Sequence, residues 1–155
     1  MKSLLYVLLF LLTVNFGIAR AAEKASPTQR QIQQIMDRME IAANAHDAAR
    51  FLAPFLHKAS LVFVINGHVI HGWSALYKQQ LKWWHHGKSD AVYVATSPVK
   101  FQRLSADVMV TTQTLASRRT SPDGKLSKGS FAVTDIWQKL PEGWCIVYAH
   151  ESWAR

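Results

Sequence analysis

The second half of the chain is an almost unbroken series of segments in which apolar and polar residues alternate. Alternation with a period of two is typical of β-strands that bury one face. Short turns between such strands make successive strands run antiparallel. The pattern therefore predicts an antiparallel sheet of about four long strands, at 91–103, 107–119, 127–139 and 144–153, with turns at 121–124 and 141–143.

The residues before this sheet have helical periodicity instead. Ser26, Pro27 and Gln29 occupy the N-cap, first and third positions of a capping box. A helix from there to about His46 would place its apolar residues in one stripe. Those residues are Ile32, Ile35, Met36, Met39 and Ala43.

Two more helices and a hairpin follow the first helix. Asp47 can cap a short second helix that stops at or before Pro54, and residues 74–84 predict a third helix. Between them, the apolar segment 61–65 leads into Asn66-Gly67, a strong signal for a tight hairpin. Helices followed by antiparallel strands predict an α+β domain in which three helices pack on one face of a curved sheet and leave a cone-shaped cavity.

The first 21 residues have the features of a cleaved signal peptide. Lys2 precedes a short apolar run, and the small residues around Arg20 fit a peptidase site after Ala21. We expect one mature domain over 22–155, located in the periplasm or secreted, without a stable membrane anchor. An uncleaved anchor helix is the alternative, although Asn15 and Gly17 interrupt the apolar run.

Net charge limits the classes of binding partner that are expected, and cysteine content limits the possible disulfides. Cleavage would remove two basic residues and no acidic one, so the net charge would fall from +8 to +6. A basic exported protein is expected to meet small anionic molecules, lipid headgroups or cell-wall polymers, and no basic run with interleaved aromatics predicts nucleic-acid binding. Cys145 is the only cysteine, so no intrachain disulfide can form. No cofactor is expected.

Two stretches carry a resemblance to a known family. The order of predicted elements around LVFVINGHVIHG (61–72) and VTDIWQKLPEGWCIVYAHES (133–152) resembles the SnoaL-like branch of the nuclear-transport-factor-2-like superfamily. The spacing of Thr134, Trp144 and His150 is also similar to the association domain of calmodulin-dependent kinases. The resemblance covers about residues 27–155. It implies the cone-shaped fold, but this superfamily includes isomerases, dehydratases, hydrolases and members without activity.

The last hairpin determines which polar residues share a face. A four-residue loop would place Asp135 on one face with Tyr148 and His150. A three-residue loop over 141–143 fits better, because proline favours the first turn position and glycine the bulge position. Leu140 would then lie opposite Trp144. The face that includes Asp135 would carry Phe131, Val133, Trp137, Val147, Ala149, Glu151 and Trp153, and Ile146 would share the other face with Trp144.

This register makes Asp135 and Glu151 the candidate catalytic residues. They would lie diagonally across the strand pair, about 7–8 Å apart at Cβ or slightly less. The resemblance implies that the positions of Thr112, Asp135 and Glu151 face the cone, where the kinase domain is basic. With acidic and neutral residues instead, the pocket is expected to suit a cationic or hydroxylated ligand. The open alternative is structural: Asp135 would pair with Arg103, Arg118 or Arg119, and Glu151 would be solvated.

Aromatic residues complete the expected pocket. Thr112, Trp84, Trp137 and Trp153 are candidate ligand-binding residues; Trp84 fits a pocket wall and a core position equally, whereas Trp83 fits the core. No metal site is expected, because the pairs His68/His71 and His85/His86 lack further ligands at suitable spacing.

Other reactive-looking side chains have ordinary structural interpretations. His150 and Ser152 would share a face without an orienting acid, so a role in sheet packing or a subunit interface is expected. Cys145 is expected to be a small buried hydrophobe.

Two functions remain open. The first is a non-catalytic protein that binds a small molecule in the cone. The alternative is an acid–base enzyme of the isomerase, dehydratase or hydrolase type, with Asp135 as general base and Glu151 as its partner. A homodimer formed through the sheet face turned away from the cone is expected in either case.

Overall fold

A computed structural model describes residues 25–120 and 124–154, so the expected signal peptide at 1–21 lies outside the described residues. Its helical elements are α1 (Pro27–Asn44), α2 (Ala48–Phe51), α3 (Trp73–Trp83) and the single turn η1 (His85–Gly87). Its strands are β1 (Val62–Ile65), β2 (His68–His71), β3 (Val92–Ala95), β4 (Lys100–Arg103), β5 (Val108–Thr120), β6 (Leu126–Leu140) and β7 (Gly143–Trp153). In this described part, no helix is both long enough and apolar enough to cross a membrane.

The helices begin where the sequence predicts. The Ser26 hydroxyl accepts a hydrogen bond from the backbone N–H of Gln29, and the Gln29 side chain accepts one from the backbone N–H of Ser26. The Asp47 carboxylate caps α2 through the backbone N–H of Arg50 at 3.0 Å. These caps satisfy helix-end donors that would otherwise lack a partner.

The strands form one mixed sheet in the order β2-β1-β7-β6-β5-β3, with β4 also paired to β5. The expectation of an antiparallel sheet with a separate hairpin is therefore correct only in part, because β1 pairs parallel to β7 and brings the hairpin into the sheet. The predicted strand 91–103 is two strands. Pro98 lies between β3 and β4 and has no N–H to donate to the ladder.

The β6–β7 hairpin corrects one detail of the predicted register. Leu140 pairs with Gly143 rather than Trp144, so Pro141 and Glu142 alone form the loop. Farther along, a β-bulge lies between the pairs Trp137↔Ile146 and Ile136↔Tyr148, and Val147 is the extra residue. The bulge restores the predicted pairing of Asp135 with Ala149.

The corrected register changes the interior near the turn. Trp144 and Ile146 are buried with Trp137, although the predicted loop placed them on the opposite face from it. The carboxylate region keeps its predicted face because it lies beyond the bulge. Residues before and after Val147 therefore follow different registers.

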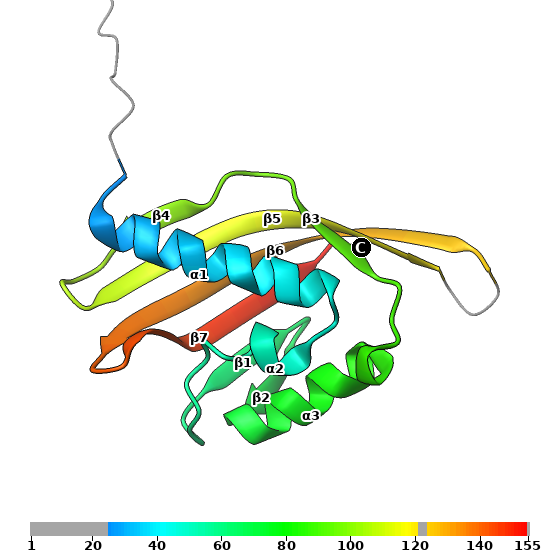
Figure 1. Cartoon of the computed structure of the whole chain (residues 1–155), viewed down its shortest axis with the longest axis horizontal. Helices are drawn as coiled ribbons and strands as arrows, with labels where there is room; N and C mark the ends of the chain where they lie inside the picture. Colours follow the sequence, from blue (N-terminus) through cyan, green and yellow to red (C-terminus); the bar gives the residue numbers. More distant parts are fainter. Residues whose placement is uncertain (1–24, 121–123, 155) are drawn as a thin grey trace, which may run out of the picture.

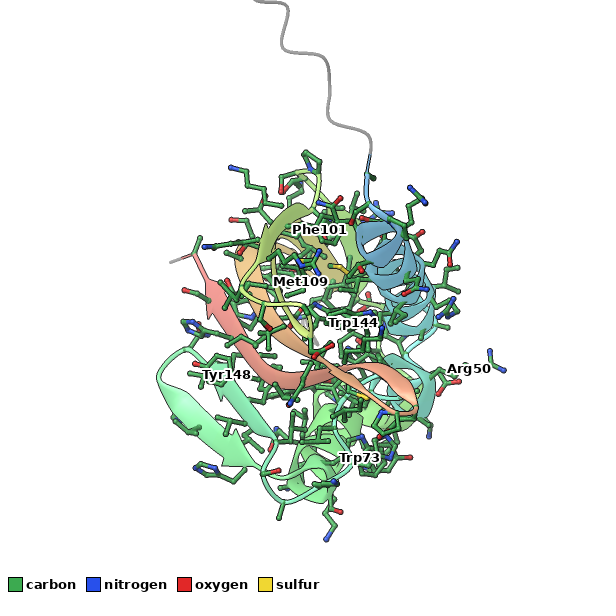
Figure 2. All side chains as sticks on the ribbon, turned by 90° about the vertical axis from the view of Figure 1, so that its left-hand side faces the viewer. Arg50, Trp73, Phe101, Met109, Trp144 and Tyr148 are labelled. Carbon is green, nitrogen blue, oxygen red and sulfur yellow. The ribbon has the colours of Figure 1, made fainter. Side chains whose placement is uncertain are left out.

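The three helices lie on one side of the curved sheet, and α1 crosses it over β5 and β6 (Figure 1). The main core fills the space between these layers and includes the fully buried side chains of Ile32, Leu52, Leu76 and Trp137. In Figure 2, Met109 and Trp144 lie within the body of the molecule, whereas the Arg50 side chain projects away from it. Burial of these large apolar side chains is the main stabilising contribution.

We expect Asp47→Ala to lower the free energy of unfolding by about 1 kcal/mol, because α2 loses its N-cap. Asp107→Ala is the matched control: it removes the same charge from an exposed loop residue whose side chain makes no described hydrogen bond. Urea denaturation of both variants measures the difference. Equal effects would show that the capping bond at α2 contributes nothing.

Candidate functional site

A cavity of about 460 Å³ lies between the helices and the concave face of the sheet. Most of its wall is apolar, and it comes from α1, α2, α3 and strands β1, β3, β5, β6 and β7. Its apolar side chains include Met36, Met39, Phe51, Phe55, Phe63, Trp83, Trp84 and Phe131. A few polar groups in such a wall are typical of a small-molecule site.

Asp135 lies in this wall and is only 4% exposed. It pairs across the strands with Thr111, whose hydroxyl accepts a hydrogen bond from the indole N–H of Trp137 at 2.9 Å. Burial raises the pKa of the Asp135 carboxyl to about 7, and the charge of Glu151 adds to the rise, while a hydrogen bond from Thr111 opposes it. The carboxyl is therefore close to half-protonated at neutral pH.

Glu151 lines the same cavity from β7 and pairs with Val133, two residues from Asp135 on β6. Its Oε1 accepts a hydrogen bond of 2.6 Å from the indole N–H of Trp153. Burial raises the pKa of Glu151 to about 7, against the opposing effect of this hydrogen bond. Two interacting carboxyls in one apolar wall titrate as a pair that holds about one proton near neutral pH.

No cation neutralises this pair in the described part of the chain. The ion pair found there joins Asp47 to Arg50 on the surface, and neither cavity carboxylate is bridged by Arg103, Arg118 or Arg119. The structural alternative for Asp135 is therefore wrong. The solvated alternative for Glu151 is not met either, since its side chain lines the cavity, is half-buried and accepts a hydrogen bond from Trp153.

An aromatic network surrounds the carboxyls. The indole N–H of Trp84 donates to the Tyr93 hydroxyl at 3.0 Å, and Phe131 contacts Tyr93 edge-on. Phe131 also stacks on Trp153, with ring centroids 4.3 Å apart. Burial raises the pKa of Tyr93, a hydrogen bond from Trp84 lowers it, and smaller effects come from the charges of Glu151 and Arg119. Tyr93 therefore stays a neutral hydroxyl in the cavity wall near neutral pH.

The structure brings together most of the residues expected at the site. Asp135, Glu151, Trp84 and Trp153 line the cavity, and Trp83 lines it as well as packing on the core. Trp137 does not, because it is fully buried behind the wall, where it holds Thr111.

Thr112 does not line the cavity either. It pairs with Thr134, their hydroxyl oxygens are 3.5 Å apart, and both lie on the opposite sheet face from Asp135. Its neighbour Thr111 shares the face of Asp135, but Thr111 is fully buried and does not line the cavity. A one-residue offset in a strand always reverses the face.

Several site residues were not predicted from the sequence. Tyr93, Gln80, Gln113 and Arg119 all line the cavity. The alternation along β5 places Gln113 and Arg119 on the face of Thr111, but the choice of face depends on the β5–β6 register. Gln80 carried a different signal, as a polar residue on the apolar side of α3, where it is 6% exposed.

The two histidine pairs lie on the surface. His68, His71, His85 and His86 are all exposed. Among the described residues, no group of three or more His, Cys, Asp or Glu side chains could hold a metal ion.

Comparisons with known proteins identify the fold. No family model and no curated protein matches the sequence. Among solved structures, a nuclear transport factor 2-like protein of unknown function from Shewanella oneidensis is similar, with 20% identity, a TM-score of 0.67 and coverage of 79% of this chain and 97% of its own.

Two other similar structures have narrower descriptions. One is a protein from Xanthomonas campestris, described as a proposed calcium/calmodulin-dependent protein kinase II association domain. It has 16% sequence identity and a TM-score of 0.65, and the match covers 83% of this chain and 91% of that protein. A proposed dehydratase of the nuclear transport factor 2-like family from Streptomyces avermitilis has 15% sequence identity and a TM-score of 0.66. The match covers 79% of this chain and 93% of that protein. This chain therefore has the nuclear transport factor 2-like fold, and its place in the SnoaL-like branch stays a prediction.

The two raised pKa values predict that stability falls as pH rises. The unfolded chain releases protons near its ordinary values of 3.8 and 4.5, whereas the folded protein keeps them to about pH 7. The free energy of unfolding should therefore decrease between about pH 4 and about pH 7, because the folded state binds more protons.

We expect Asp135→Asn to remove much of this dependence and to stabilise the protein by about 2–4 kcal/mol at about pH 8, with little effect at about pH 4. Denaturant unfolding at both pH values measures it, and the exposed Asp107→Asn is the control. A wild-type stability that rises with pH over this window would contradict the burial of two unpaired carboxyls.

Proposed function

We propose that this protein is an enzyme that transfers a proton on a small, largely apolar molecule, with Asp135 as the general base and Glu151 as its acidic partner. The observation that carries the proposal is the pair of cavity carboxyls, both with pKa values near 7 and both without an ion pair in the described structure. A base whose pKa lies near the working pH is the most effective for general catalysis.

The arrangement suits removal of a proton from a carbon next to a carbonyl group. Asp135 in its ionised form would take the proton, and the electron pair of the broken C–H bond would move towards the carbonyl. Glu151, carrying the proton of the pair, would donate a hydrogen bond to the carbonyl oxygen as negative charge develops there. Isomerisation and elimination of water both begin with this step, and the apolar wall supports it by excluding bulk water.

Ligand binding without turnover is the second candidate. It is supported by the small exposed fraction of Asp135, 4%, and by the hydrogen bond to its carboxylate from Thr111, whose own hydroxyl accepts one from Trp137. A buried acid held in this way can simply donate or accept one hydrogen bond to a ligand. The solved structures with this fold include one of unknown function and one proposed dehydratase, which fits either candidate.

The proposal extends to location and assembly. The signal-peptide pattern in residues 1–21 supports export to the periplasm or outside the cell. The sheet face turned away from the helices supports a homodimer, since it carries Thr134 and Tyr148, which are only half-buried in one chain. Sedimentation of the mature protein tests the dimer, and a monomer at tens of micromolar would contradict it.

We expect the wild-type protein to catalyse exchange of acidic C–H protons of small bicyclic ketones with deuterium in heavy water. Asp135→Asn should reduce this rate by about 10²-fold or more, because general-base catalysis contributes about 10²–10⁴-fold. Proton NMR of the ketone gives the rate, and Glu151→Gln should give a smaller loss. Asp107→Asn is the matched control for the change in charge.

Carbon-13 NMR titration of the two carboxyls provides an independent measurement. We expect both to titrate well above the ordinary values of 3.8 and 4.5. Titration of both at those ordinary values, or equal exchange rates for the wild type and Asp135→Asn, would contradict the assignment of Asp135 as base.

A further inference from the structure

The charges around the cavity are arranged by depth. Asp135 is buried and Glu151 is half-buried in the inner wall, whereas the charged residues among the exposed lining side chains are Glu40, Arg119 and Lys128. We call these exposed lining residues the rim. The rim therefore has two positive groups and one negative group, and the interior wall has two acids.

Arg119 is the rim cation best placed to reach a ligand. It lies at the end of β5 opposite Ser127, two residues from Ser117, and therefore on the sheet face that lines the cavity. Arg119 and Tyr93 both line the cavity, and the charge of Arg119 slightly lowers the pKa of the Tyr93 hydroxyl. Lys128 lies in the alternate position, opposite Arg118, so its side chain starts from the other face of the hairpin.

The guanidinium of Arg119 has no partner in the described structure. Residues 25–120 and 124–154 provide no ion pair or hydrogen bond to it. The nearby Asp90 carboxylate accepts a hydrogen bond from the backbone N–H of Thr120 at 2.8 Å, and this bond is the main cause of its lowered pKa. An unpaired guanidinium at the edge of an apolar cavity offers several N–H donors to an anion.

We propose that the cavity binds a largely apolar small molecule with one anionic group, a carboxylate or sulfonate, which Arg119 holds at the rim while the uncharged part of the molecule extends to the buried carboxyls. The placement of the reacting part of the molecule at Asp135 and Glu151 rests on the proposed function, whereas anion binding by Arg119 does not. An anion at the buried end would meet Glu151 and Asp135, and repulsion between like charges disfavours that orientation. At the rim the same group gains a charge-assisted hydrogen bond.

This assignment revises the ligand that the sequence predicts. The sequence-based expectation of a cationic or hydroxylated ligand depends on carboxylates that carry full negative charge. The pair in the cavity holds about one proton near neutral pH, so its attraction for a cation is reduced. The rim that faces an entering ligand carries Arg119 and Lys128 against Glu40, so its net charge is positive.

Two fluorescent probes with the same aromatic skeleton test the proposal. Anilinonaphthalene sulfonate carries one anionic group, and phenylnaphthylamine is the same molecule without it. We expect the wild-type protein to bind the sulfonate more tightly than phenylnaphthylamine. Arg119→Gln should lower the affinity for the sulfonate about tenfold and leave the affinity for phenylnaphthylamine nearly unchanged. Amide chemical-shift changes at the cavity residues Tyr93 and Gly129 establish that the probe is in the cavity.

Arg118→Gln is the matched control, because Arg118 is the adjacent residue on the opposite face and the change in net charge is identical. We expect it to alter neither affinity. An equal loss of affinity for the sulfonate in both variants would overturn the proposal, since it would indicate attraction by net charge alone. Tighter binding of the neutral probe, or of the cationic dye thioflavin T, by the wild-type protein would also overturn it.

The probes are not turned over, so this result is independent of catalysis. Asp135→Asn should bind the sulfonate at least as tightly as the wild type does, because it removes a negative charge. If Arg119→Gln does not change probe affinity, the prediction of deuterium exchange still stands. If the wild-type protein does not catalyse exchange, the predicted probe affinities still stand. The two proposals can therefore be rejected separately.

Discussion

The pairing of Asp135 with Thr111 on one side and Ala149 on the other is the constraint on which the site depends. It places a carboxyl on the concave face, next to the hydroxyl that Trp137 holds from behind the wall. It also fixes Glu151 on the same face, diagonal to Asp135. The β-bulge at Val147 makes this compatible with a short loop at the hairpin end, because it separates the register of the core from that of the site.

Placing two acids in an apolar wall has an energetic cost that the rest of the fold must offset. The layer of large side chains around Ile32, Leu76 and Trp137 supplies that stability. A salt bridge to either acid would have reduced the cost, and it would also have lowered the pKa towards ordinary values. Its absence among the described residues is therefore the feature that keeps the pair chemically useful, at the expense of stability near neutral pH.

The sequence was sufficient to predict the helices and three of the four long strands, because those follow from periodicity and capping. The shared face of Asp135 and Glu151 was predicted from a three-residue hairpin loop, whereas the structure has a two-residue loop and reaches the same pairing through the bulge at Val147. The sequence could not locate that bulge, since nothing in an alternating strand distinguishes the extra residue from its neighbours. Thr112 was assigned to the cavity from the family resemblance, whereas the β5–β6 register pairs Thr111 with Asp135 and places Thr112 on the other face. Parallel pairing of β1 with β7 is a long-range contact, and local patterns carry no signal for it.

The separation of charge by depth links the fold to the choice of ligand. The concave face is continuous along β5, so the alternate residues Gln113, Leu115, Ser117 and Arg119 line the cavity from its interior to its rim. Burial raises the pKa of the acids at one end and so reduces their negative charge, whereas an exposed guanidinium stays positively charged at the other. A molecule with one charged end and one uncharged end can satisfy both environments in a single orientation. A uniformly polar or uniformly apolar ligand would leave one end of the cavity unmatched.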